Sequence, residues 1–256
     1  MINLKKNSGL DVGLDLEKMG LVFGDSLGEK ELAARSIDEM KEVLLDKTVD
    51  APRELYYMYR GVGREGDDEK MRRYKLRYDI TVIRPGMLGQ EIIKTAGHYH
   101  PGAYPELYEV LWGEALCLLQ RRDEDDPRKI KDVVLVKARA REKIVCLPNY
   151  GHILINPGDK PLVTANWVST EFSSDYSLYR QAQGAAYFVL DNDGEMEFRK
   201  NGFFRDLPEI KIVCPCLPQQ QFGLNIDRPI YDILREAEKL DFLNNPQRYS
   251  YGGCFV

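Results

Sequence analysis

The sequence predicts a mainly β protein, a barrel or jelly roll with helical additions at its two ends. Between residues 55 and 200, short segments alternate apolar with polar side chains, which is the pattern of a half-buried strand. Turn-forming residues separate these segments at regular intervals, as in barrels and jelly rolls. Runs nearer the two termini instead repeat their apolar residues at helical spacing.

The N-terminal extension, residues 1–50, is expected to be helical or irregular and to pack on the barrel. Segment 28–47, GEKELAARSIDEMKEVLLDK, suits a helix, and Ser36 is a suitable N-cap for its second part. The DAPRE segment that follows ends the helical pattern. The apolar residues at helical spacing are Leu32, Ile37, Met40, Val43 and Leu44.

The barrel is expected to span residues 51–203. Its clearest strand is YKLRYDITVI, in which Leu76, Tyr78, Ile80 and Val82 alternate with polar residues. A hairpin is expected around the Asp-Gly pair at 193–194, because this pair favours a tight turn. The other strands are expected in EIIKTAGHYH, ELYEVLW, EALCLLQ, KDVVLVKA, EKIVCLP and HILINPGDKPLVTANWVS, the last being two strands around a turn.

The C-terminal extension, residues 204–256, starts proline-rich and irregular and then contains one expected helix at 229–244. Its apolar face suits packing against the barrel or a dimer partner better than membrane binding. The apolar residues of that face are Ile230, Ile233, Leu234, Ala237, Leu240 and Leu243.

Composition excludes several classes of function. The 256 residues are 43% hydrophobic, enough for a sizeable core without disulfides. A net charge of -5 disfavours nucleic acid and anionic membranes as partners. We find no membrane-spanning apolar run and no signal peptide, so a cytoplasmic protein is expected. The five cysteines, including Cys214 and Cys216, are expected to be reduced thiols, since no fourth zinc ligand accompanies the Cys-Pro-Cys segment.

The segment GHYHPGAYPELYEV contains two of the three histidines in the chain. His98 and His100 point to the same side if the segment is a strand, and Glu106 follows a short loop. The third histidine, His152, begins a later strand. Three imidazoles and one carboxylate suit a single divalent ion: Zn²⁺ is satisfied by four ligands, whereas Fe²⁺, Mn²⁺ or Ni²⁺ keeps positions open. The alternative is that these are ordinary structural histidines.

Two motifs resemble the cupin superfamily. GHYHPGAYPELYEVLWG is similar to the first cupin motif, and PNYGHILIN to the second. The closer resemblance, over about residues 50–200, is to the cupin-type glucose-6-phosphate isomerases known best from archaea. The matching residues are Thr81, Thr95, Gly97, His98, His100, Glu106, Tyr108, Gly113, Gln120, Pro148, Tyr150, His152, Asp175 and Tyr176.

This resemblance implies a cupin jelly-roll barrel that interconverts glucose 6-phosphate and fructose 6-phosphate in glycolysis and gluconeogenesis, as a homodimer. It implies metal ligands at His98, His100, Glu106 and His152, with Glu106 and Tyr108 catalytic. It also implies that the sugar phosphate contacts Tyr56, Thr81, Thr95, Gly97 and Tyr176. The resemblance is compatible with hydrogen transfer either through a cis-enediol or by a hydride shift.

Three departures from the family pattern concern the substrate. The loop between His100 and Glu106 is one residue shorter than usual, Ser174 replaces a common histidine, and Val168 replaces an expected aromatic residue. The alternatives therefore stay open: another cupin metalloenzyme, such as a dioxygenase or a different sugar isomerase, or a cupin that binds a sugar phosphate without catalysis.

Overall fold

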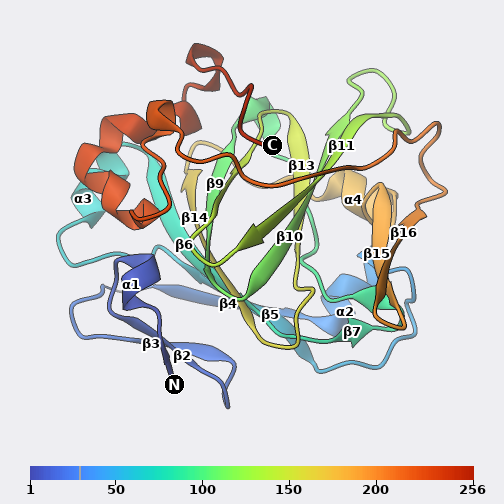
Figure 1. Ribbon diagram of the computed structural model, residues 1–256, viewed down its shortest axis with the longest axis horizontal. Helices are drawn as coiled ribbons and strands as arrows, with labels where there is room; N and C mark the ends of the chain where they lie inside the picture. The colour runs from blue at the N-terminus through green and yellow to red at the C-terminus, as the bar shows by residue number, and fades with distance from the viewer. Residues whose placement is uncertain (29) are drawn as a thin grey trace.

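Two antiparallel sheets face each other at the centre of the protein (Figure 1). The computed structural model describes residues 1–28 and 30–256. The larger sheet has, in order, β12 (Lys143–Cys146), β9 (Glu106–Trp112), β14 (Leu162–Ser169), β6 (Leu76–Ile83), β5 (Glu54–Arg60) and β4 (Glu31–Ser36). The smaller has β13 (Tyr150–Ile155), β10 (Glu114–Arg122), β11 (Ile130–Arg139) and β17 (Lys211–Val213), the last parallel to β11.

Smaller elements surround this barrel. Two further sheets contain β1 (Ile2–Asn3), β2 (Val12–Asp15) and β3 (Gly20–Phe23), and β7 (Met87–Leu88), β8 (Glu91–Ile92), β15 (Tyr187–Asn192) and β16 (Glu195–Lys200). The α-helices are α1 (Lys5–Ser8), α2 (Ile37–Met40), α3 (Asp68–Arg73) and α4 (Ser177–Gln181). The 3-10 helices are η1 (Lys41–Val43), η2 (Pro101–Ala103), η3 (Gln220–Phe222), η4 (Ile230–Leu243) and η5 (Pro246–Arg248). The predicted mainly β barrel with helical additions is confirmed.

Each face of the larger sheet has its own core. On β6, Tyr78, Ile80 and Val82 are fully buried in an outer core, while Ile83 belongs to the core between the two sheets. The alternation predicted for this strand is therefore present, but its apolar face lies outside the barrel. The opposite face of β6, which carries Thr81 and Ile83, points into the barrel, because successive residues of a strand point to opposite sides.

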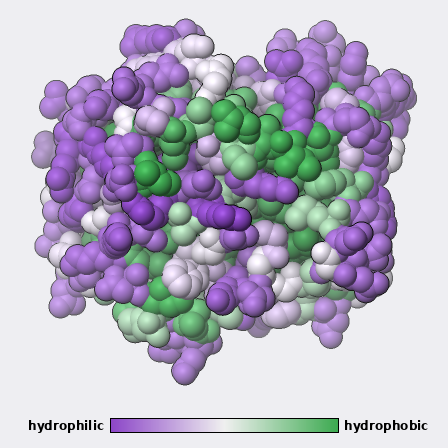
Figure 2. All heavy atoms as spheres, in the orientation of Figure 1, coloured by the Kyte–Doolittle hydropathy of each residue, from purple (hydrophilic) through white to green (hydrophobic). Residues whose placement is uncertain are grey.

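The C-terminal extension covers this outer core. The Trp167 indole donates a hydrogen bond to the carbonyl of Ile230 at 2.8 Å, and Tyr231 packs edge-on against Tyr78 with ring centres 5.0 Å apart. The predicted helix at 229–244 is confirmed in position, but it is a 3-10 helix interrupted at Glu236. On the side of the molecule seen in Figure 2, apolar side chains gather near the C-terminal end of the chain, within a mostly hydrophilic surface.

The helix predicted for residues 28–47 is wrong over its first part, and Glu29 lies outside the described residues. Strand β4 pairs with β5 instead, and Leu32, which the helix would have buried, is 58% exposed. The backbone hydrogen bonds between β4 and β5 determine the structure of this segment, although its residues also favour a helix. The predicted cap is correct: the Ser36 hydroxyl accepts from the Glu39 N–H, and the Glu39 carboxylate accepts from the Ser36 N–H. Of the helices in the described ranges, none has both the length and the apolar character needed to cross a membrane.

A buried ion pair fastens the C-terminal extension to β9. The Glu109 carboxylate lies 3.0 Å from the Lys143 ammonium, and both side chains are 1% exposed. Glu109 also accepts from the N–H of Ile230 at 2.8 Å, and Lys143 donates to the carbonyl of Ile226 at 3.1 Å. Burial raises the pKa of Glu109 to about 7, against the opposing effect of Lys143. Removing one member of the pair would leave the other charged group buried without its partner.

We therefore expect Lys143→Met to lower the free energy of unfolding by about 3–5 kcal/mol, because it leaves Glu109 buried without a cation. Urea unfolding followed by circular dichroism measures the change. The matched control is Arg139→Met, since Arg139 and Glu114 form an exposed pair that contributes less than about 1 kcal/mol. Equal effects of the two substitutions would contradict this account of the extension.

Candidate metal centre

A single antiparallel pairing brings two of the histidines together. The N–H of His98 donates to the carbonyl of His152 at 3.3 Å, and the N–H of His152 donates back at 3.0 Å. Directly opposed residues point to the same face of a sheet, so the two rings lie side by side, 4.5 Å apart. The strand predicted for EIIKTAGHYH is thus shorter than expected: β8 ends at Ile92, and only isolated pairings continue it.

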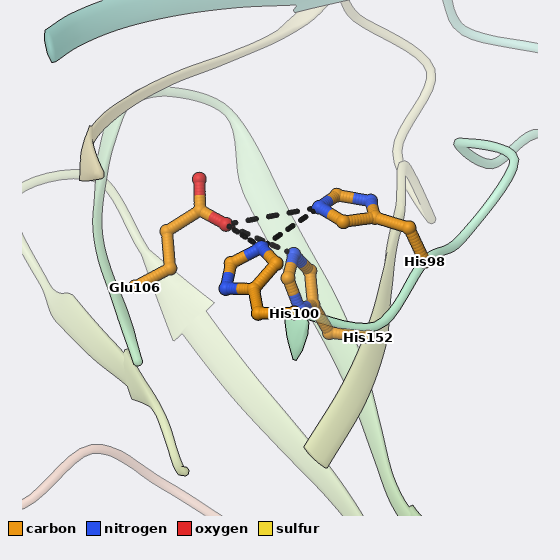
Figure 3. A group of neighbouring side chains, drawn as sticks. All are labelled: His98, His100, Glu106 and His152. Atoms are coloured by element: carbon orange, nitrogen blue, oxygen red, sulfur yellow. Dashed lines mark hydrogen bonds and ion pairs between the residues drawn. The ribbon is translucent and has the colours of Figure 1, made fainter. Parts of the chain in front are cut away.

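Glu106 faces these rings from the larger sheet, at the first residue of β9 (Figure 3). Its Oε2 atom lies 3.2 Å from Nε2 of His100, 3.2 Å from Nε2 of His152 and 4.0 Å from Nε2 of His98. One ligand atom from each of the four residues lies within 4.8 Å of all the others. The sequence prediction that these four side chains converge is therefore correct in geometry.

The spacing of the four atoms fits a metal ion. With bonds of about 2.0–2.3 Å, two ligand atoms are separated by about 2.8–3.3 Å at a right angle and by about 4.0–4.6 Å across the ion. Nε2 of His98 and Nε2 of His100 lie 3.0 Å apart, a separation that suits two ligands of one ion. In the described part of the chain, the buried Oε2 of Glu106 has no hydrogen-bond donor. A shared cation would satisfy all of these atoms at once.

Neighbouring groups fix the orientation of two ligands. Nδ1 of His100 lies 2.9 Å from the carbonyl oxygen of Tyr104, which can only accept, so Nδ1 carries the proton and Nε2 presents its lone pair to the centre. The amide of Asn166 donates to Oε1 of Glu106 at 2.6 Å, which leaves Oε2 directed at the imidazoles. Phe172 packs on the His100 ring at 4.3 Å.

Asn166 and Phe172 were not predicted from the sequence. Asn166 stands in the otherwise apolar strand LVTANWVS, and a buried amide there was the available signal. Phe172 lies four positions after Val168, the residue that stands where an aromatic side chain was expected. Trp167, beside Val168, lies in the outer core and does not face the centre.

Electrostatics keep three of the candidate ligands, Glu106, His98 and His152, in the state that binds a cation. Burial alone would raise the pKa of Glu106, but the interactions of its carboxylate with the nearby His100 and His152 rings hold it well below its usual range. Burial, and then the neighbouring imidazoles, lower the pKa of His98 well below its ordinary value, and burial lowers that of His152. The carboxylate is thus charged and these two imidazoles are neutral near pH 7.

Tyr108, predicted to be catalytic, does face the centre. Its hydroxyl lies 3.4 Å from Nε2 of His152. Burial, reinforced by the charge of Glu106, raises its pKa well above the usual value of a tyrosine. The hydroxyl therefore stays protonated and can donate a hydrogen bond near pH 7.

Three of the five predicted substrate contacts lie on one side of the metal centre. The Tyr176 ring packs against His98 at 5.4 Å, and the Tyr56 hydroxyl accepts from the N–H of Ala96 at 3.2 Å. Gly97, which stands between Ala96 and His98 in the sequence, has a φ of +81°; a Cβ there would come within 2.4 Å of Ile153. A larger residue could not hold this turn, which positions the backbone beside His98.

The other two predicted contacts are placed differently. The hydroxyl of Thr95 already accepts from the N–H of Leu154 at 3.0 Å, which gives it a structural role in holding β13. Thr81 lies on the inner face of β6, paired across the sheet with Thr164 of β14 and Met58 of β5. Within the described residues its hydroxyl forms no side-chain hydrogen bond.

The two-sheet barrel and the convergent His₃Glu cluster between its sheets define a cupin-type protein with a candidate metal centre. The model of the family "Glucose-6-phosphate isomerase (GPI)" matches residues 32–204, about two thirds of the chain. The chain therefore belongs to the glucose-6-phosphate isomerase family.

Several relatives have that name. The glucose-6-phosphate isomerase of Thermococcus gammatolerans is 30% identical over 142 residues, covering 54% of this chain and 65% of that protein, slightly under two thirds of its length. The enzyme of Thermococcus onnurineus is 27% identical over 195 residues, covering 72% of this chain and 93% of its own. Among solved structures, an oxalate decarboxylase mutant of Bacillus subtilis aligns with a TM-score of 0.35 at 16% identity, covering 48% of this chain and 28% of that one.

We expect the metal-free protein to lose stability as the pH falls below about 6.5. The pKa values of His98 and His152 are lower in the folded than in the unfolded chain, so protons bind the unfolded state more tightly in that range. Urea unfolding with a chelator present, at about pH 7.5 and about pH 5.5, measures the difference. In the double variant His98→Asn, His152→Asn, the free energy of unfolding should differ less between the two pH values. An unchanged difference would contradict the claim that these two histidines cause the loss of stability.

Proposed function

We propose that this protein interconverts glucose 6-phosphate and fructose 6-phosphate at one divalent ion held by His98, His100, Glu106 and His152. The observation that carries the proposal is the convergence of these four ligand atoms inside a barrel of the glucose-6-phosphate isomerase family. A bound divalent ion would polarise the sugar oxygens at C1 and C2 and stabilise negative charge on them. Fe²⁺, Mn²⁺, Ni²⁺ and Zn²⁺ all suit this donor set.

In this proposal Glu106 acts first as a ligand. Asn166 holds its Oε1 atom, and Oε2 faces His100 and His152, so both oxygens are engaged. The low pKa of this carboxyl also makes it a weak base. In an enediol route, Glu106 would take the proton from C2 and return it to C1; in a hydride shift no base touches carbon. The contacts of Glu106 favour the ligand role.

Tyr108 would donate its hydroxyl hydrogen bond to the sugar oxygen beside the ion. Its raised pKa keeps the proton on the hydroxyl, which suits a donor to an oxygen that gains negative charge during the reaction. The phosphate would lie on the side of Tyr56, Gly97 and Tyr176, with Thr81 on the inner face of the larger sheet and Thr95 holding the turn. Hydroxyl groups and a backbone N–H are suitable phosphate donors.

We expect purified protein to isomerise fructose 6-phosphate, to lose this activity on treatment with a chelator, and to regain it on addition of one of the four divalent ions. A coupled assay for glucose 6-phosphate measures the rate. Circular dichroism should show that the chelated protein stays folded at about pH 7.5, since the barrel core does not include the ion. Metal-loaded protein that binds fructose 6-phosphate without turnover would instead support a sugar-phosphate sensor.

Glu106→Gln separates the two roles of this residue. If Glu106 is chiefly a ligand, the variant should bind metal more weakly, by about 10-fold or more, and excess metal should restore most of the turnover. If it is the base, kcat should fall by about 100-fold or more while metal content is retained. Elemental analysis combined with the coupled assay distinguishes these results, and the contacts of the carboxylate favour the first.

A further inference from the structure

Arg35 points into the barrel beside the proposed substrate side of the metal centre. It lies on β4 directly opposite Tyr56 of β5, and opposed residues share a face of the sheet. Its guanidinium carbon is 5.8 Å from the centre of the Tyr176 ring. The same ring packs against His98 at 5.4 Å. The Tyr176 ring therefore contacts both Arg35 and the candidate metal ligand His98.

The guanidinium of Arg35 is only partly satisfied. Its side chain is 19% exposed, and Nη1 donates to the Glu39 carboxylate at 2.9 Å. Nε, however, is buried and has no hydrogen-bond acceptor within residues 1–28 and 30–256. An unpaired buried donor on a charged group costs free energy, so such groups are usually paired in folded proteins. Glu39 thus pairs with Nη1 of the guanidinium, whereas Nε has no acceptor among the described residues.

Arg35 borders a narrow cavity that other hydrogen-bonding groups also line. The cavity is lined by Arg35, Gly97, Tyr176 and Arg180, and also by the carboxylates Glu39 and Glu42. The N–H of Gly97 forms no backbone hydrogen bond with any described residue. A planar guanidinium and a backbone N–H that line the same cavity are suited to the oxygens of a phosphate, which can accept from both.

We propose that Arg35 is the residue that makes the site specific for phosphorylated sugars, by donating from Nε to the phosphate. This inference rests on the proposed function and adds a half-buried cation to the hydroxyl and amide donors. Arg35 does not touch the reacting carbons in this arrangement. It should therefore affect substrate binding and leave the chemical step unchanged.

Arg180 provides a matched comparison. Its guanidinium carbon is also 5.8 Å from the Tyr176 ring, but its side chain is 61% exposed and pairs with Glu42 at 3.3 Å. A solvated and paired cation contributes little to binding, because water and its partner already satisfy it. Arg35 and Arg180 thus carry the same charge at the same distance from the Tyr176 ring, but Arg35 is more buried.

The experiment compares Arg35→Met, Arg35→Lys and Arg180→Met with the unaltered protein, all loaded with the same metal. Calorimetry measures binding of fructose 6-phosphate, inorganic phosphate and unphosphorylated fructose, and the coupled assay gives KM and kcat. We expect Arg35→Met to weaken binding of both phosphorylated probes and to raise KM by about 10-fold or more, with kcat and metal content retained. Binding of fructose should not change.

The two controls sharpen the result. Arg35→Lys keeps the charge and, if Arg35→Met does not fold, carries the test, since loss of the Nε donor should still weaken phosphate binding several-fold. Arg180→Met should behave like the unaltered protein. Equal losses in the Arg35 and Arg180 variants would assign the effect to general charge and overturn the proposal.

Failure of this inference is distinct from failure of the proposed function. Isomerisation with unchanged KM in both Arg35 variants would overturn the role of Arg35 and leave the enzyme assignment standing. Phosphate binding that depends on Arg35 without isomerisation would support Arg35 and contradict the enzyme assignment. Unaltered protein that binds neither phosphorylated probe would overturn both.

Discussion

The backbone pairing of His98 with His152 is the contact on which the candidate site depends. It joins the segment before β9 to the smaller sheet and aligns two imidazoles that are 54 positions apart in the chain. The positive φ of Gly97 permits this alignment, since a side chain there would collide with Ile153 and Tyr179. On the other side of the same segment, Tyr99 pairs with Asp175, which brings Tyr176 over His98. One short irregular segment thus positions metal ligands and substrate contacts together.

Buried charges fasten both extensions to the barrel in a similar way. Glu109 and Lys143 hold the chain around Ile230. On the opposite end, Lys94 donates to the carbonyl of Val43 and pairs with a buried carboxylate of β8. Such pairs stabilise little compared with apolar packing, but they cost much when broken. They therefore select one position of each extension on the barrel, which in turn fixes β4, the strand that carries Arg35.

Sequence reasoning succeeded where a local pattern determines the structure. The alternation in β6 and the Asp-Gly hairpin of β15 and β16 follow from side-chain periodicity and turn geometry, and both are present. The four candidate ligands were identified by residue type and motif. The failures concern contacts between distant segments: helical spacing around Leu32 gave no sign of pairing with β5, and Asn166 and Arg35 gained their significance from strands placed beside them by the fold. Turn signals in a single sequence identify the two strands of a tight hairpin, but they do not show which strands from distant segments become neighbours.

The central claim is that three imidazole nitrogens and one carboxylate oxygen bind a single ion. X-ray absorption spectroscopy of protein loaded with one equivalent of Zn²⁺ or Mn²⁺ tests it most directly. The account predicts only nitrogen and oxygen ligands at about 2.0–2.3 Å, with the scattering pattern of about three imidazoles. A sulfur ligand at about 2.3 Å, or one imidazole or fewer, would place the ion elsewhere and contradict the account.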